Sequence, residues 1–326
     1  MARIPPPVAT VRAAVRRALT AGPADARGPV LVACSGGADS LALAAATAFV
    51  APRLGIAAGL VTVDHRLQDG SAERAAAVAR WGRSAGFDPV EVATVDVGGR
   101  PGGPEAAARD ARYEALSAAA ERFDAVAVLL GHTRDDQAET VLLALARGAG
   151  PRGLAGMPFR KGHFVRPLLD VSRADTREAC AVLGLAAWED PHNADPAYAR
   201  ARVRADALPA LAAALGPAVV ANLARTASLL AADVAYLDDV AAQALAGVRT
   251  PAGLSVTALA RLAPAIRGRV LHAWAAELGA PGAALSHRHV TALDALVTGW
   301  HGQGPAALPQ GILVARRAGD LVRAAL

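Results

Sequence analysis

Short apolar runs alternate with longer stretches of helical spacing over the first half of the chain. Apolar residues fill nearly every position of each run, which is typical of strands buried on both faces of a sheet. The stretches between them repeat apolar residues every three or four positions, as helices do. The predicted strands are 29–35, 56–64, 89–96, 125–132 and 164–170, and the predicted helices are 38–51, 71–86, 104–123, 135–147 and 172–184.

Strands that are separated by single helices predict an α/β fold in which helices cover both faces of a parallel sheet. Ligands of such folds bind at the carboxyl ends of the strands. Five polar or glycine positions end predicted strands or come directly after one, and are therefore expected at one edge of the sheet: Ser35, Asp64, His65, Gly131 and His132.

The second part of the chain has a different pattern. It is mostly helical to about residue 247 and mixed from residue 250 onward. We expect one domain over 1–218 and a small, mostly helical domain over 219–326.

Charge also distinguishes the two parts. The net charge is +5, with 22 basic and 22 acidic residues in 1–199 but 12 basic and 7 acidic residues in 200–326. A basic second part favours a polyanionic partner. The segment SHRHV (286–290) and the pair Arg316-Arg317 are its candidate phosphate contacts.

Two cysteines, Cys34 and Cys180, form neither a disulfide framework nor a CxxC pair, as is usual in a reducing cytoplasm. The segment MARIPPPVAT lacks the apolar stretch of a signal peptide, and no uncharged apolar run reaches 18 residues. We therefore expect a cytoplasmic protein without a membrane span.

The segment ACSGGADSLAL (33–43) joins the first predicted strand to a helix. The first N–H groups of a helix have no internal partner, so this turn favours an anion. Gly36 and Gly37 let a ligand approach the backbone, and Ser35 and Ser40 can donate hydroxyl hydrogen bonds. Asp39 would repel a bare phosphate but suits a Mg²⁺ ion that bridges phosphates.

SGGADS resembles the SGGxDS signature of the PP-loop, or N-type, ATP pyrophosphatases. The resemblance implies that ATP binds with its pyrophosphate in this loop and is attacked at the α-phosphate. The loop matches neither of two other nucleotide-binding motifs, Walker A and GxGxxG. Without the resemblance, the pattern could equally be a structural turn that binds no ligand.

GHTRDDQAET (131–140) resembles the GHxxDDQxET block of the tRNA(Ile)-lysidine synthetases within that superfamily. His132, Asp136 and Glu139 are spaced to share one helix face at the end of a strand. The resemblance implies an active-site role for the three, while an acidic first helical turn is the structural alternative.

A third block, WEDPHNADPAYARARVR (188–204), resembles a further stretch of the same family, although His192 and Ala201 depart from its pattern. Arg200 and Arg204 lie one helical turn apart and can reach ATP phosphate or tRNA backbone. Solvated arginines are the alternative. The matching positions are Trp188, Asp190, Asn193, Asp195, Tyr198, Arg200 and Arg204.

Two weaker matches complete the resemblance. VDHRLQ (63–68) has Arg66 where the family has glycine, and PEAAARDARY (104–113) resembles a stretch whose match implies that Glu105, Arg109, Arg112 and Tyr113 line the tRNA or lysine path. An ordinary helical pair between Glu105 and Arg109 explains part of the second match equally well.

The resemblance implies the following reaction, with ATP and Mg²⁺ as cofactors. The wobble cytidine of tRNA(Ile) with a CAU anticodon is adenylated, pyrophosphate leaves, and the ε-amine of L-lysine displaces AMP.

That amine has a pKa of roughly 10.4, so about one molecule in 10³ is reactive at pH 7. A general base, worth about 10²–10⁴-fold, can offset this; His132, Asp136 and Glu139 are candidates. Asp136 could instead hold Mg²⁺ beside Asp39.

Two other functions fit parts of the sequence. A related PP-loop tRNA 2-thiocytidine enzyme would need cysteines that bind an iron–sulfur cluster, and a nucleotide-binding sensor would not need Asp39 or the DDQAET face.

A homodimer is one assembly that we expect for this protein.

Overall fold

The computed structural model describes residues 4–22, 28–66, 68–98, 103–190, 195–282 and 284–324. The chain forms two compact units, Met1–Leu230 and Ala231–Leu326. The division falls inside helix α10 (Val219–Val248), which begins where the second domain was placed from the sequence. The domain limits themselves stay a prediction.

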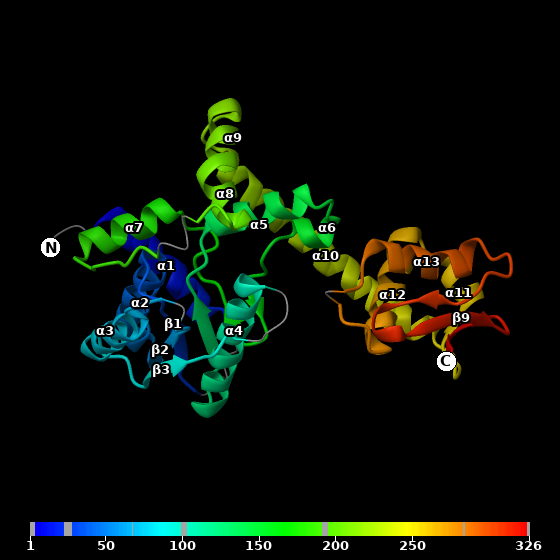
Figure 1. The fold of residues 1–326 in the computed structure, drawn as a ribbon, viewed down its shortest axis with the longest axis horizontal. Coiled ribbons are helices and arrows are strands. Elements are labelled where there is room, and N and C mark those ends of the chain that lie inside the picture. The colour runs from blue at the N-terminus through cyan, green and yellow to red at the C-terminus, as the bar shows by residue number, and fades with distance from the viewer. Residues whose placement is uncertain are drawn as a thin grey trace. The chain divides into compact units, whose positions relative to one another are not determined.

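A six-stranded sheet organises the first unit, with the strand order β3-β2-β1-β4-β6-β5 (Figure 1). All neighbouring strands pair in parallel except β5, which is antiparallel to β6. The predicted α/β class is therefore confirmed. The strands are β1 (Val30–Ala33), β2 (Ala58–Asp64), β3 (Val90–Thr94), β4 (Ala127–Leu130), β5 (Arg160–Lys161) and β6 (Phe164–Val165).

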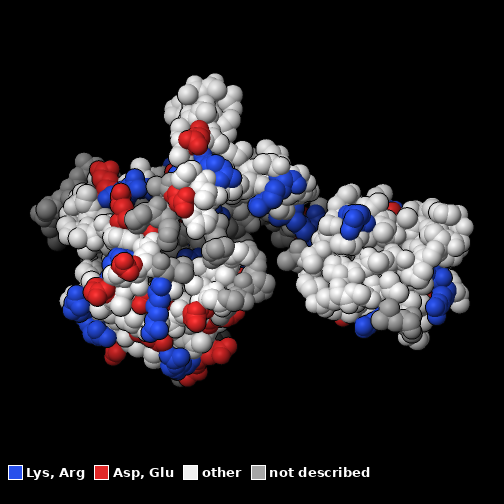
Figure 2. Space-filling model, viewed as in Figure 1, with Lys and Arg blue, Asp and Glu red and all other residues white. Residues whose placement is uncertain are grey.

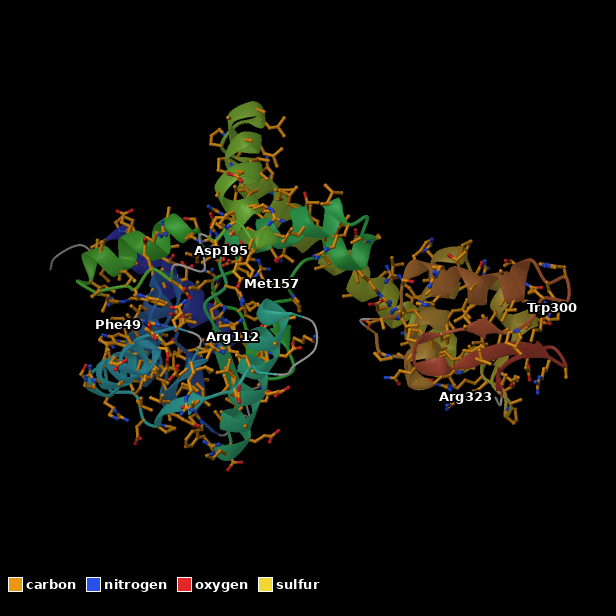
Figure 3. The ribbon with its side chains drawn as sticks, in the orientation of Figure 1. Phe49, Arg112, Met157, Asp195, Trp300 and Arg323 are labelled. Carbon is orange, nitrogen blue, oxygen red and sulfur yellow. The ribbon has the colours of Figure 1, made fainter. Side chains whose placement is uncertain are left out.

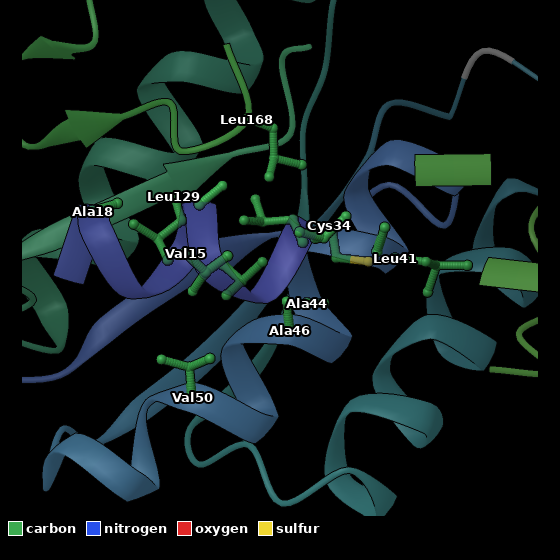
Figure 4. Close-up of a cluster of buried hydrophobic side chains, with 14 of the residues drawn as sticks. Val15, Ala18, Cys34, Leu41, Ala44, Ala46, Val50, Leu129 and Leu168 are labelled. Atoms are coloured by element: carbon green, nitrogen blue, oxygen red, sulfur yellow. The ribbon is translucent and has the colours of Figure 1, made fainter. Parts of the chain in front are cut away.

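Apolar cores lie on both faces of this sheet. One core joins the sheet to α1, α2 and α7, with Val15, Val50 and Leu129 fully or almost fully buried (Figure 4). The other joins it to α4 through Leu31 and Leu116. The helices of the unit are α1 (Pro6–Thr20), α2 (Ala38–Val50), α3 (Ser71–Ser84), α4 (Pro104–Arg122), α5 (Arg134–Ala146), α6 (Pro151–Leu154), α7 (Arg173–Val182), α8 (Ala199–Arg202) and α9 (Leu208–Leu215), with short η1 (Pro52–Leu54) and η3 (Val203–Ala207).

The structure differs from the expected elements in two places. Helix α1 was not predicted, although Val8, Val11 and Val15 have the spacing of a buried helix face. The predicted strand 164–170 is reduced to β6, because Leu168 is buried in the core without a strand partner. The predicted loop 148–163 contains α6 and β5.

The second unit combines helices with a four-stranded antiparallel sheet in the order β7-β10-β9-β8. Its own core includes Leu271, Leu293 and Leu321. The elements are β7 (Leu254–Ser255), α11 (Val256–Arg261), α12 (Pro264–Glu277), α13 (His287–Thr298), β8 (Ala306–Ala307), η4 (Pro309–Gly311), β9 (Leu313–Arg317) and β10 (Asp320–Ala324).

Within the described residues, no one helix has the length and apolar character to cross a membrane, although a bent pair, Ala199–Leu215 with Val219–Val248, meets the criteria on length and composition.

Candidate active site

The glycine-rich loop lies between the end of β1 and the start of α2. Gly36 has a φ of +84°, and a Cβ there would lie 3.0 Å from Val78 Cγ2, so the position favours glycine. The Ser40 hydroxyl accepts the N–H of Ser35 at 3.2 Å and donates to the Gly37 carbonyl at 2.9 Å. No side chain caps the first turn of α2. The turn therefore presents helix N–H groups to an anion, with the hydroxyls of Ser35 and Ser40 beside them.

Gly131 brings the end of β4 against this loop. A Cβ at Gly131 would lie 3.1 Å from both the N and the Cα of Ser40. A side chain would therefore push β4 away from the start of α2. The first two sequence blocks meet at this contact, as the parallel sheet requires.

His132 and Thr133 connect β4 to α5, and a capping box at Thr133 fixes the start of that helix. Asp136 Oδ2 accepts the N–H and the hydroxyl of Thr133, both at 2.8 Å. Asp136 and Glu139 are both buried, Glu139 completely. Gln137 instead bonds the backbone of Met157 at 2.8 and 3.0 Å and fixes the loop after α5.

Two arginines bind the buried carboxylates of α5. Arg173 donates to Asp136 Oδ1 at 2.8 Å and to Glu139 Oε1 at 3.0 Å. Arg204 donates to Glu139 Oε1 at 2.8 Å and Oε2 at 3.1 Å, and to Asp136 Oδ1 at 3.3 Å. Arg200 Nε lies 3.7 Å from Glu139 Oε2. Arg200 and Arg204 therefore belong to an ion-pair network, and the interpretation of them as solvated arginines is wrong.

Arg173 and Thr176, both on α7, were missed by the sequence analysis. The Thr176 hydroxyl donates to Asp39 Oδ1, and Arg173 Nε lies 3.7 Å from Asp39 Oδ2. Asp135 accepts the backbone N–H of Arg173 at 2.8 Å. A signal for Arg173 does exist in the sequence: an arginine in the first turn of a helix opposes the helix dipole and implies an acidic partner.

The pKa values of the carboxylates diverge across the network. Burial raises the pKa of Asp39, and the nearby Asp136 adds to this rise. Burial would also raise the pKa of Asp136, but Arg173 and the Thr133 N–H outweigh it, so that pKa is lowered. Asp136 is consequently held ionised, while the charge on Asp39 is less well compensated.

Of the two predicted Mg²⁺ ligands, Asp39 fits a metal ion better than Asp136 does. The described residues hold no group of three or more His, Cys, Asp or Glu side chains that could bind a metal. The Asp136 carboxylate already accepts bonds from Thr133, Arg173 and Arg204. Mg²⁺ at nucleotide sites takes one or two carboxylates and completes its shell with phosphate and water. Asp39 suits such an ion, since a cation would offset its repulsion from Asp136.

His132 lies between the acidic network and a group of arginines, and its Nδ1 is buried without a hydrogen-bond partner. Burial lowers the pKa of His132 to about 3; Asp136 opposes the shift, whereas Arg112 and Arg166 increase it. The imidazole is therefore neutral at physiological pH.

Stability is expected to fall in acid because of this histidine. Below about pH 6.5 the unfolded chain binds a proton at His132 that the folded chain does not bind, so lowering the pH favours unfolding. The contribution is about 2 kcal/mol between pH 8 and pH 5. Urea unfolding at both pH values should show a loss for the wild type that is about 2 kcal/mol larger than for His132→Asn. Replacing the exposed His301 by asparagine should reproduce the wild-type loss, and equal losses in all three proteins would contradict the expectation.

Asp64 ends β2 and His65 follows it, at the same edge of the sheet. Asp64 Oδ1 accepts the N–H of Arg66 at 2.9 Å, and Arg66 has a φ of +52°, a conformation that glycine adopts readily. The arginine found in place of the family's glycine therefore keeps a glycine-like turn. His65 and Arg66 line a cavity of about 550 Å³ together with the end of β3, residues 94–98.

The remaining predicted residues lie around this centre. Arg109 and Arg112 flank the ring of Tyr113 on α4, at 5.1 and 5.6 Å from its centroid. The Trp188 N–H donates to the Gly36 carbonyl at 2.9 Å, which ties the third block to the loop. His192 and Asn193, as well as the side chain of Glu105, lie outside the described residues.

In the second unit, the predicted phosphate contacts have mixed surroundings. His289 Nδ1 accepts the N–H of Ser286 and caps α13. Arg316 donates to the Leu296 carbonyl at 3.2 Å and lies 5.5 Å from the ring of Trp300, while Arg317 is exposed. On the face shown in Figure 2, the charged side chains of this unit are mainly basic.

Two family models match the chain. A PP-loop domain model matches residues 10–211, and a model described as the TilS substrate binding domain matches residues 254–322. The first match implies the use of ATP. The whole of α10 lies between the two ranges.

Relatives with known names match nearly the whole chain. The tRNA(Ile)-lysidine synthase of Salinispora tropica is 71% identical over 98% of this chain and 97% of its own length. The enzyme of the same name from Thermobifida fusca is 57% identical over 98% of each chain. Among solved structures, a U34-tRNA thiolase from Methanococcus maripaludis has a TM-score of 0.55 at 18% identity, covering 69% of this chain and 80% of its own. This last likeness supports the fold alone.

Proposed function

This chain belongs to the tRNA(Ile)-lysidine synthase family, and from that premise we propose how its residues attach L-lysine to the wobble cytidine of a tRNA(Ile) with a CAU anticodon. The observation that supports the proposal is the placement of an anion loop and a buried carboxylate–arginine network at one edge of the sheet. Such a site can bind a nucleotide and a cationic amine together.

The first step is the adenylation of the base. The 2-position oxygen of the cytidine attacks the α-phosphorus of ATP, and the bond to the pyrophosphate oxygen breaks. Ser35, Gly36, Gly37 and Ser40 hold the leaving pyrophosphate through helix N–H groups and hydroxyls. Gly131 keeps β4 close to that loop.

The nucleoside part of ATP lies toward the end of β2. Asp64 and His65 are positioned there beside the cavity of about 550 Å³. We assign them, with His132, to the surroundings of the adenosine. When bound, Mg²⁺ would neutralise phosphate charge, and Asp39 is the residue that would hold it. Asp136 is the alternative ligand, although its oxygens already accept four hydrogen bonds.

The second step is the attack of the lysine ε-amine on the 2-position carbon, which releases AMP and a proton. Asp136 and Glu139 are the carboxylates that hold the amine. Both are bound to Arg173 and Arg204. Phosphates compete for these guanidinium groups, so ATP draws the arginines away and frees the carboxylates for the amine. The proton then passes to Asp136, Glu139 or His132.

The tRNA lies over the basic residues around this edge. Arg109, Arg112, Arg200 and Arg204 are the proposed contacts in the first unit. The second unit, whose substrate-binding family model covers residues 254–322, binds the RNA backbone. The target cytidine leaves the anticodon stack to reach the site, which loop bases do at low cost.

Labelled L-lysine should be incorporated into unmodified tRNA(Ile) with a CAU anticodon in the presence of ATP and Mg²⁺. The methionine tRNA with the same anticodon is the control and should remain unlabelled. Incorporation into the isoleucine tRNA alone supports the proposal. A folded, ATP-binding protein that incorporates no lysine would refute it.

Other expectations from the sequence stay proposals. We place the protein in the cytoplasm. A homodimer would cover the exposed side chains of Leu215 and Leu229, which are 72% and 65% accessible. The 2-thiocytidine alternative is disfavoured because the chain has only two cysteines, Cys34 and Cys180, and both are buried.

A further inference from the structure

Arg74, in the first turn of α3, joins two segments that flank the anion loop, residues 35–40. Its Nη1 donates to the Asp69 carbonyl and its Nη2 to Oε1 of Gln68, both at 3.0 Å. Its guanidinium also lies over the ring of Trp188, 4.2 Å from the centroid. Gln68 and Asp69 belong to the loop that follows β2, whereas Trp188 opens the third sequence block. Arg74 therefore fastens that loop to the third block.

A second contact joins the same two segments. Gln68 Nε2 donates to Asp190 Oδ1 at 2.9 Å, so the Gln68 amide accepts from Arg74 through its oxygen and donates to Asp190 through its nitrogen. Figure 3 shows Asp195, the next described residue of the block, near α8 and above the sheet. Arg74 and Gln68 accordingly hold the beginning of a segment that crosses the edge where the anion loop lies.

The beginning of the block also contacts the anion loop through its backbone. The Trp188 N–H donates to the Gly36 carbonyl at 2.9 Å. The C=O and N–H of one trans peptide point in opposite directions, so this bond makes the Gly37 N–H point away from Trp188. Gly37 is the N-cap of α2, and its N–H has no hydrogen-bond partner among the described residues. That N–H is therefore available to an anion.

Helix α3 touches the loop directly as well. Val78 lies four residues after Arg74, and a Cβ at Gly36 would come 3.0 Å from Val78 Cγ2. Residues four apart share one face of a helix, so the face of α3 that carries Arg74 also packs against the loop. The loop is thus supported by α3 in two ways, through Val78 and through the contact of Arg74 with Trp188.

We propose that Arg74 is a positioning residue for the anion loop: by holding Trp188, it keeps the Gly37 N–H pointed toward the phosphates of ATP. This inference rests on the function proposed above, in which the loop holds the leaving pyrophosphate. Without the guanidinium, the ring of Trp188 loses its contact with α3, and the Gly36 carbonyl loses a fixed donor. The peptide between Gly36 and Gly37 can then rotate, which turns its N–H away from the phosphates.

A direct contact between Arg74 and a phosphate is the competing role. Both Nη atoms of Arg74 already donate to the loop after β2, and one face of its guanidinium is covered by the indole ring. These contacts favour the indirect role, since a phosphate would have to displace them.

The first test measures ATP affinity by titration calorimetry, with the full chain and Mg²⁺ but without tRNA. Arg74→Gln should weaken ATP binding about 3–30-fold, the range expected for the loss of a cation–π contact. Arg74→Lys should recover most of this loss, because an ammonium group also binds the face of an indole ring. Arg80→Gln is the matched control: Arg80 is an exposed arginine on the same helix, and the variant should behave as the wild type.

A double-mutant cycle tests whether Arg74 acts through Trp188. Trp188→Ala should weaken ATP binding by itself, and adding Arg74→Gln to it should cause no further loss. Trp188→Phe keeps a weaker platform for the guanidinium and should lose less affinity than Trp188→Ala. This pair of Trp188 variants carries the test if Arg74→Gln does not fold.

The second test measures tRNA-dependent pyrophosphate release. At saturating ATP, Arg74→Gln should lower kcat about 10-fold with an unchanged KM for tRNA, because a misdirected N–H stabilises the charge of the leaving group less well. A variant that was merely less stable would show no such division between kcat and the KM for tRNA at a temperature where it is folded.

Unchanged ATP affinity in Arg74→Gln, or additive losses in the double variant, would overturn the positioning role. So would a raised KM for tRNA with intact ATP binding, which would indicate that Arg74 contacts RNA directly. A wild type that binds ATP but releases no pyrophosphate with tRNA would refute the proposed function, whereas non-additive losses of ATP affinity would still support the role of Arg74.

Discussion

Replacing Glu139 by glutamine is expected to lower the free energy of unfolding by about 3 kcal/mol. Glu139 has no exposed surface, and its two oxygens bind Arg173 and Arg204. Breaking a buried ion pair costs about 3–5 kcal/mol because it leaves a buried charge uncompensated. The lower end applies here, since the side chains of Arg200 and Arg204 are 31% exposed and partly screened by water.

Thermal and urea unfolding of the full chain would measure this loss, which corresponds to roughly 6–12 °C in Tm. The matched control is Glu189→Gln. Glu189 pairs with Arg177 at 3.4 Å, but their side chains are 84% and 61% exposed, so the expected loss is at most about 1 kcal/mol. If both variants lost the same small amount, the network would not stabilise the fold as the geometry indicates.

Replacing Asp39 by asparagine is expected to reduce tRNA-dependent pyrophosphate release by about 10²–10³-fold, since it removes one charge from the proposed phosphate and Mg²⁺ site. Asparagine keeps the size of the side chain and can still accept the hydrogen bond from Thr176. Stability should not fall, because the raised pKa of Asp39, caused chiefly by burial, means that its charge opposes folding at neutral pH.

Glu73→Gln is the control for this second prediction. Glu73 lies in the first turn of α3 as Asp39 lies in the first turn of α2, but it is exposed and outside the loop. Both substitutions lose an interaction with a helix dipole. Only Asp39→Asn should slow pyrophosphate release, and a variant with near wild-type release and unchanged dependence on Mg²⁺ concentration would exclude Asp39 from the site.

Much of the fold was predictable because buried parallel strands are nearly continuous apolar runs. The same apolar pattern predicted a strand over 164–170, but only Phe164–Val165 forms one. Leu168 is apolar because it fills the core and not because it pairs in the sheet. Helix α1 was missed although its valines have helical spacing and proline is favoured in the first turn of a helix.

The site residues also fall into a group that the sequence could predict and a group that it could not. Residues within one motif, such as Ser35 and Ser40 or His132 and Asp136, were predictable because a strand end and the helix after it fix their spacing. Arg173 lies 34 positions from Glu139 and Thr176 lies 137 positions from Asp39. No local pattern states which distant side chain will pair with which.

The sequence by itself determined the parallel sheet, the edge at which its ligands bind, and the motif residues that gather there, because these follow from periodicity and from strand direction. The tertiary structure alone decided which arginines neutralise Asp136 and Glu139, and which lie around Tyr113 without a carboxylate partner among the described residues. The physical reason is that charge compensation depends on distances between elements, and those distances exist only after the cores on both faces of the sheet have packed.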